Sequence, residues 1–221
     1  MFPLRDSTPS QHFPLVTILL IIANTVVFIH TISQGLAGME QIFYIFGMVP
    51  AYYSTPGGAP LGYLSFITST FLHGGWMHLI GNMWVLWLFG DNVEDRMGSG
   101  RFLLFYLVCG VIAGMTHYYF NPTSTVPVVG ASGAVAGVMG AYFLMFQRAR
   151  ILTYVPPFFL FTVPAWVYLG FWAFSQLWSG TVELAINSYG QIAFWAHVGG
   201  FAAGMILYRF FLRRERNNYY Y

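Results

Sequence analysis

The chain has 221 residues, of which 57% are hydrophobic, 20% aromatic and only 7% charged. A typical soluble domain carries roughly 25% charged residues, so the composition excludes an ordinary soluble domain and predicts a protein of the lipid bilayer. All nine basic residues are arginines scattered between apolar runs, and the net charge is +2. Because no basic patch results, nucleic acid is not expected as a partner.

Six apolar runs approach the length of about 20 residues that a membrane-spanning helix needs. They lie near residues 13–33, 77–91, 101–119, 131–147, 155–179 and 190–212. We therefore expect an all-α, six-helix membrane bundle that forms a single domain over residues 1–221. The stretch from Gln34 to Trp76 is interrupted by glycine and proline but rich in aromatic residues, which predicts a long interfacial loop between helices 1 and 2.

The arginines predict the orientation of the bundle. They fall before run 1, between runs 2 and 3, between runs 4 and 5, and after run 6, and the residues are Arg5, Arg96, Arg101, Arg148, Arg150, Arg209, Arg213, Arg214 and Arg216. By the positive-inside rule, both termini face the cytosol. The first run is too long for a secretory signal and lacks an Ala-x-Ala-like exit. A compact core without a removable targeting segment favours the plasma (inner) membrane of a prokaryote.

Four polar residues lie inside the predicted spans at similar depth. Polar groups in hydrocarbon are unfavourable, so they are functional candidates by default. Counting 1.5 Å per residue from the cytosolic helix ends places them at heights of roughly 14 to 22 Å. The four residues are His78, Asn82, Ser132 and His197. Three helices thus place them in one layer, in the outer half of the bilayer.

Small residues predict which of these helices touch. Ala136 and Gly140 share the helix face of Ser132, and Gly200 and Gly204 share the face of His197. Small side chains let transmembrane helices pack closely. Contact between helices 4 and 6 along these faces is therefore expected to bring the Ser132 hydroxyl to the His197 imidazole.

A serine hydroxyl needs a base within hydrogen-bond reach to act as a nucleophile, and neutral histidine serves near pH 7. Ser132 and His197 fit these roles. None of the seven acidic residues lies well inside a span, so an acidic third member is not predicted. Asn82 and His78, with the Ser132 backbone N–H at the start of its helix, are candidate donors to an oxyanion.

Other interpretations of these residues exist. A lone serine near a helix start is usually a cap. His73 and His78 are candidate metal ligands with His197, but their spacing of five residues is not that of a helical HExxH site and no Glu accompanies them. Intramembrane histidines also serve as proton relays in transporters, which would need acidic partners or broken helices. The glycine-rich GASGAVAG segment lacks the Lys-Ser/Thr pair of a phosphate loop, so no nucleotide is expected.

Four motifs, in order, resemble the rhomboid proteases. They are HGGWMHLIGNM (73–83), GDNVEDRMGSG (90–100), GASGA (130–134) and AHVGGFAAG (196–204). The resemblance covers about Gly62 to Tyr208, and GxSG in the fourth span together with AHxxGxxxG in the sixth is highly specific.

The resemblance implies a six-span rhomboid fold and an intramembrane serine endopeptidase. It implies that Ser132 is the nucleophile, that His197 is the base, and that His78, Asn82 and the Ser132 amide line the oxyanion site. His73, Glu94, Arg96 and the motif glycines Gly130, Gly133, Gly200 and Gly204 would be structural. Family members cut transmembrane proteins near the outer end of their spans, without metal, nucleotide or other cofactor.

Two positions depart from the family pattern. Leu64 and Ser65 stand where many members have Trp-Arg in the first loop, and Ala136 stands where many have a tyrosine that packs on the catalytic histidine. Neither departure removes a catalytic group. The alternative of a non-catalytic rhomboid-like protein that binds membrane clients would be expected to lose Ser or His, and this chain keeps both.

Overall fold

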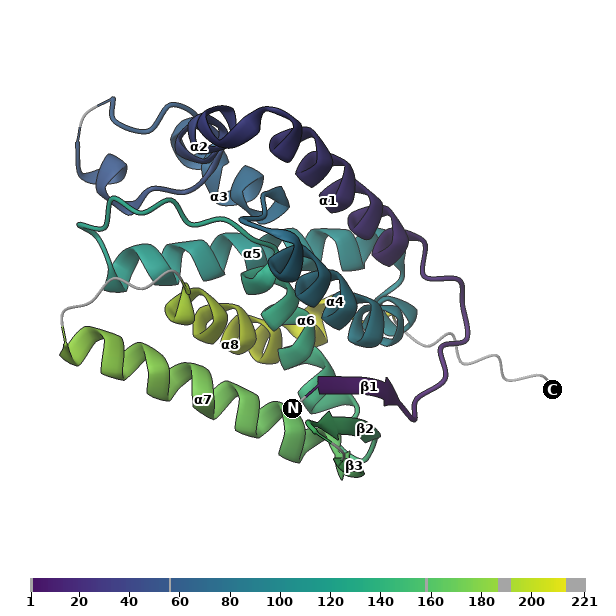
Figure 1. Ribbon diagram of the computed structural model, residues 1–221. Helices are drawn as coiled ribbons and strands as arrows, with labels where there is room; N and C mark the ends of the chain where they lie inside the picture. The colour runs from purple at the N-terminus through teal and green to yellow at the C-terminus, as the bar shows by residue number, and fades with distance from the viewer. Residues whose placement is uncertain (1, 56, 158, 187–191, 214–221) are drawn as a thin grey trace.

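Six long helices form the body of the molecule (Figure 1). The computed structural model describes residues 2–55, 57–157, 159–186 and 192–213. The long helices in these ranges are α1 (Leu15–Ser33), α4 (Trp76–Met97), α5 (Ser99–Phe120), α6 (Ser132–Met145), α7 (Ala165–Ala185) and α8 (Phe194–Phe211). Each overlaps one predicted apolar run. By length and composition alone, α1 and α5 qualify as membrane spans among the described helices, so the count of six spans stays a prediction.

Helix α6 runs through the middle of the bundle, where α4, α5, α7 and α8 contact it (Figure 1). Every residue from Gly133 to Tyr142 is buried. On the outside of the bundle, α7 exposes large apolar side chains, among them Phe171, Phe174 and Trp178. A helix surface that is apolar both inward and outward is typical of a protein surrounded by lipid.

The predicted close contact between α6 and α8 is present, but on α6 Gly133 and Gly137, rather than the predicted Ala136, meet Gly200 and Gly204. A Cβ atom on Gly200 would lie 2.0 Å from the Gly133 carbonyl oxygen, and one on Gly204 would lie 1.9 Å from the Gly137 carbonyl oxygen. Both distances are far below van der Waals contact. The backbones of the two helices therefore touch directly, which only glycine permits at these positions.

Near the C-terminal end of α4, Glu94 connects this helix to α1 and α5 through hydrogen bonds. Its buried carboxylate accepts hydrogen bonds from the backbone N–H groups of Val16 (2.9 Å) and Thr17 (2.8 Å) in the first turn of α1. It also accepts from the hydroxyls of Thr17 (2.8 Å) and Ser99 (2.6 Å), the latter at the start of α5. A carboxylate at a helix N-terminus satisfies free N–H groups and the helix dipole. The nearby Arg96 carbonyl accepts the Arg213 N–H at 3.0 Å.

Replacing Glu94 with alanine is expected to lower the free energy of unfolding by about 3 kcal/mol, because four donors lose their acceptor at once. The measurement is unfolding in mixed detergent micelles. Glu40→Ala is the matched control, since Glu40 is exposed on α2 (Gly35–Phe46). Equal stability of the two variants would contradict this role of Glu94.

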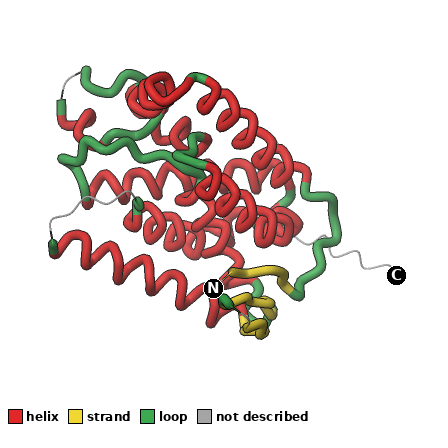
Figure 2. Tube along the Cα trace, viewed as in Figure 1, coloured by secondary structure: helices red, strands yellow, loops and turns green. Residues whose placement is uncertain are grey.

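A three-stranded antiparallel sheet corrects the all-α prediction (Figure 2). Strand β2 (Arg150–Val155) lies between β1 (Phe2–Asp6) and β3 (Phe159–Pro164). The fifth span was predicted over 155–179, but α7 occupies Ala165–Ala185. The error arises because hydropathy alone does not distinguish an apolar hairpin from the start of a helix. Residues 190–191 of the sixth predicted span, and Arg214 and Arg216, lie outside the described residues.

The segment between α1 and α4 is more ordered than the predicted loop. It contains α2, a short α3 (Ser65–Thr68) and the 3₁₀ turns η1 (Pro50–Ser54), η2 (Gly62–Leu64) and η3 (Ser69–Phe71). Where the family often has Trp-Arg, the Ser65 hydroxyl bonds the Gly62 carbonyl at 2.8 Å and also the Tyr53 hydroxyl. The Tyr53 ring packs against Phe66, with ring centroids 5.0 Å apart. These contacts anchor the segment without the family pair.

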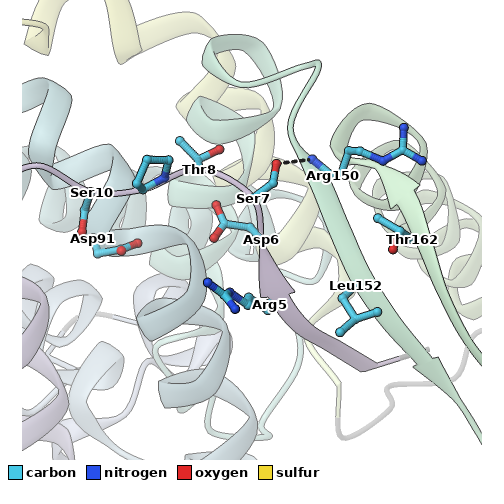
Figure 3. Close-up of a pocket in the computed structure, with 10 residues that line it drawn as sticks. Arg5, Asp6, Ser7, Thr8, Ser10, Asp91, Arg150, Leu152 and Thr162 are labelled. Carbon is cyan, nitrogen blue, oxygen red and sulfur yellow. Dashed lines mark hydrogen bonds between the residues drawn. The ribbon is translucent and has the colours of Figure 1, made fainter.

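A surface pocket of about 640 Å³ lies beside β1 (Figure 3). Its lining includes Asp6 and Arg150, and the backbone N–H of Arg150 donates to the Ser7 hydroxyl at 2.9 Å. Burial raises the pKa of Asp6, against the lowering effect of the hydrogen bond from Tyr142. Because Tyr142 is ten residues beyond Ser132 on α6, about 15 Å along the helix, this pocket is separate from the region of Ser132.

Candidate active site

Ser132 is the first residue of α6, and the backbone before it is held by the segment between α1 and α4. The Gly130 N–H donates to the Ser69 carbonyl at 2.9 Å, and Met48 and Val128 pair through their backbones. Gly130 has a φ of 133°, a conformation that favours glycine. The turn at Gly130 leads directly into α6, so that Ser132 lies at the start of this helix.

Ser132 and His197 are in direct contact. The Ser132 Oγ lies 2.8 Å from the His197 Nε2. His197 belongs to the first turn of α8, where its backbone N–H donates to the Ala193 carbonyl at 3.2 Å. Both side chains are half-buried. The glycines of the α6–α8 backbone contact follow Ser132 and His197 in their helices. The two side chains therefore meet at the N-terminal end of that contact.

The second ring nitrogen of His197 has a partner that the sequence reasoning missed. The His197 Nδ1 lies 2.7 Å from the Gln176 Oε1 on α7. The Trp172 ring, one turn earlier on α7, is tilted 35° to the imidazole with centroids 5.8 Å apart. A glutamine inside an apolar run is a polar residue in hydrocarbon, and that signal was available in the sequence. The contact to His197 depends on the position of α7 along the chain. The predicted fifth span, 155–179, differs from that position, so it did not indicate the contact.

His78 and Asn82 converge on the backbone that precedes Ser132. A Cβ atom on Gly130 would lie 2.7 Å from the His78 Nε2 and 3.7 Å from the Asn82 Nδ2. The Gly74 N–H donates to the His78 Nδ1 at 3.4 Å, so the neutral ring carries its proton on Nε2, facing Gly130. Within the described residues the buried Asn82 Nδ2 has no hydrogen-bond partner. Two side-chain donors from α4 therefore lie beside the backbone that precedes Ser132.

His73 lies next to this group but faces the interior. It is fully buried, and its ring meets the His78 ring edge-on with centroids 5.1 Å apart. Burial, and then the charge that His78 would carry, lowers the pKa of His73 to about 3, which the Phe71 backbone opposes. His73 is therefore neutral at pH 7. Within the described ranges, no three His, Cys, Asp or Glu side chains are grouped closely enough to bind a metal ion.

The fold and these contacts describe a helical bundle with a serine–histidine pair among its helices. Residues 61–214 match the family model described as the rhomboid domain. The chain therefore belongs to the rhomboid family. A rhomboid domain implies an integral membrane protein, as the composition predicts.

Named relatives include proteases and proteins of organelles. Rhomboid protein 1, mitochondrial, of Saccharomyces cerevisiae is 30% identical over 155 residues, which are 68% of this chain and 42% of the relative. Rhomboid protease GluP of Bacillus subtilis is 44% identical over 75 residues, 34% of this chain and 14% of that protein. The putative rhomboid protease YdcA of the same bacterium is 30% identical over 132 residues, 55% of this chain and 66% of that protein.

Family membership defines the class but not the activity of this chain. The chain spans less than half the length of the yeast relative. The family contains both serine intramembrane proteases and inactive members. The yeast relative is mitochondrial by name, so a prokaryotic plasma membrane, like the cytosolic placement of both termini, stays a prediction.

Proposed function

We propose that this chain is an intramembrane serine endopeptidase that cleaves transmembrane proteins near the outer end of their spans. The observation that carries the proposal is the 2.8 Å contact between the Ser132 Oγ and the His197 Nε2. It joins a nucleophile to a base within the range that proton transfer needs. The protease names of GluP and YdcA support the same chemistry.

In the proposed reaction, the Ser132 Oγ attacks the carbonyl carbon of the scissile peptide while its proton passes to the His197 Nε2. The carbon–nitrogen bond then breaks, and the leaving amine takes that proton. The product is an ester between Ser132 and the N-terminal part of the substrate. Water, deprotonated by His197, attacks the ester, and its proton returns to the Ser132 oxygen as the carboxylic acid leaves.

The tetrahedral intermediate carries negative charge on the former carbonyl oxygen and needs donors fixed in advance. In the proposal, the His78 Nε2–H, the Asn82 Nδ2–H₂ and the Ser132 backbone N–H supply them. The first N–H groups of α6 have no acceptor within their own helix, which suits this role. Within the described part of the chain the Asn82 Nδ2 has no hydrogen-bond partner, which fits a donor that awaits substrate.

The depth of the site supports the position of the cut. Ser132 starts α6, and the arginine-rich gaps lie at the opposite ends of the helices. Together with the positive-inside rule, this supports a dyad in the half of the bilayer away from the cytosol. A substrate span would then be cut near its outer end.

The test is cleavage of a single-span membrane protein by the purified chain in detergent, with a chelator present. Wild type is expected to cleave and Ser132→Ala to lose at least about a thousandfold in rate. Ser33→Ala is the matched control, because Ser33 is exposed at the end of α1. Cleavage that survives Ser132→Ala would refute the proposed nucleophile. Failure of the wild type to cleave or to label with a fluorophosphonate would favour the non-catalytic, client-binding alternative.

A further inference from the structure

Helix α7 contributes a polar contact to the base that the proposed dyad does not use. The Gln176 Oε1 lies 2.7 Å from the His197 Nδ1, on the opposite side of the ring from Ser132. We propose that Gln176 is a positioning residue that fixes the tautomer and the orientation of the His197 imidazole. This inference rests on the proposed function, since it concerns the base of the same reaction.

The chemistry of the contact dictates the tautomer. An amide oxygen only accepts hydrogen bonds, so the His197 Nδ1 must carry the proton. In the neutral ring, Nε2 then presents a lone pair to the Ser132 hydroxyl, which donates to it. The opposite tautomer would place a proton on Nε2 and leave no acceptor for the serine. Gln176 therefore selects the one neutral form that is able to act as a base.

The Gln176 amide is itself held in one orientation. Its Nε2 donates to the Ser175 Oγ at 3.0 Å, and the Ser175 hydroxyl donates to the Trp172 carbonyl at 2.6 Å. Flipping the amide would turn its oxygen towards the Ser175 Oγ, whose hydrogen is already donated to the Trp172 carbonyl, so that contact would lose its hydrogen bond. A chain of hydrogen bonds thus runs from the α7 backbone to the nucleophile, and each member fixes the next.

The same helix also restrains the face of the imidazole. Trp172 is four residues before Gln176, so both side chains leave the same face of α7. The Trp172 ring lies 5.8 Å from the imidazole centroid. At position 136 of α6, where many family members have a tyrosine that packs on the catalytic histidine, this chain has Ala136, whose methyl group is too small to replace that ring. The amide and the indole of α7 supply the orientation that Ala136 does not.

The test compares Gln176→Met, Gln176→Glu and wild type. Methionine keeps the length of the side chain but has no strong acceptor, whereas glutamate keeps the acceptor and adds charge. Gln41→Met, at an exposed position of α2, is the matched control. The first readout is the ¹⁵N spectrum of histidine-labelled protein at neutral pH, in which the His197 signals are assigned by their loss in His197→Ala. The second readout is kcat across pH.

We expect a protonated Nδ1 and a bare Nε2 for His197 in wild type and in Gln41→Met, and a mixture of tautomers in Gln176→Met. The Gln176→Met variant should lose about tenfold to a hundredfold in kcat with KM little changed, less than the loss of the base itself. In Gln176→Glu, the carboxylate stabilises the imidazolium, so activity should disappear at a higher pH on acidification. The other titratable groups near His197, His78 and His117, are unchanged in these variants.

A purely structural Gln176 would change stability without moving the tautomer or the pH profile, and that result would overturn the inference. So would wild-type tautomer populations and kcat in Gln176→Met. The ring spectrum does not require turnover. If wild type fails to cleave but Gln176→Met still changes the His197 tautomer, the positioning role stands and the proposed protease function fails.

Discussion

Replacing His197 with alanine is expected to lower kcat by about a thousandfold or more, because the Ser132 hydroxyl loses the base that takes its proton. The His197 Nε2 lies 2.8 Å from the Ser132 Oγ. The His78 ring, on α4, lies against Gly130, with its Nε2 2.7 Å from the position of a Cβ atom there. The measurement is single-turnover cleavage in detergent for His197→Ala, Ser132→Ala and the double variant.

The double variant is the sharper part of this experiment. Residues that act as one unit are not additive, so the double variant should be no slower than either single variant. Additive losses would indicate that the two side chains act independently and would contradict a dyad. In the wild type, activity should also fall as the pH drops through the pKa of His197, since only the neutral imidazole accepts a proton.

The second large effect concerns the contact between α6 and α8. Replacing Gly204 with alanine is expected to lower the free energy of unfolding by about 2–3 kcal/mol. The new Cβ would lie 1.9 Å from the Gly137 carbonyl oxygen, and the atoms nearest to it belong to backbone that cannot rotate away. The helices would have to separate, which also moves His197 away from Ser132.

Gly100→Ala provides a control of opposite sign. Gly100 lies on α5, and apart from its chain neighbours and the backbone of its own helix, no described atom lies within 4 Å of a Cβ built there. Alanine has a higher helix propensity than glycine, so Gly100→Ala should stabilise the protein by up to about 1 kcal/mol. Unfolding in mixed micelles measures both variants, and fluorophosphonate labelling of Ser132 reports the geometry of the site. Equal stability of the two variants would refute the close helix contact.

Much of the architecture follows from local patterns in the sequence. Apolar runs locate the six long helices because burial in lipid requires a continuous apolar stretch. The glycines at positions 200 and 204 predict the α6–α8 contact, because only small residues allow backbones to touch. The rhomboid motifs led to the family to which the chain belongs.

Other features depended on contacts between distant segments. The sheet forms because β1, at the start of the chain, pairs with β2 some 150 residues later, and hydropathy carries no information about strand pairing. The shift of the fifth helix from 155–179 to Ala165–Ala185 follows from the same hairpin. Glu94 was expected to be structural, but its cap on α1 is visible only once the helices are packed.

By itself, the sequence determined that the chain is a membrane protein and where its helices lie approximately, and it predicted which polar residues stand at similar depth within them. These properties depend on composition and on counting residues along a helix. The tertiary structure decided which atoms meet: the Ser132 hydroxyl with the His197 Nε2, and the Gln176 oxygen with the His197 Nδ1. Such contacts depend on the rotation and register of three helices relative to one another. Packing sets these quantities, and no single segment encodes them.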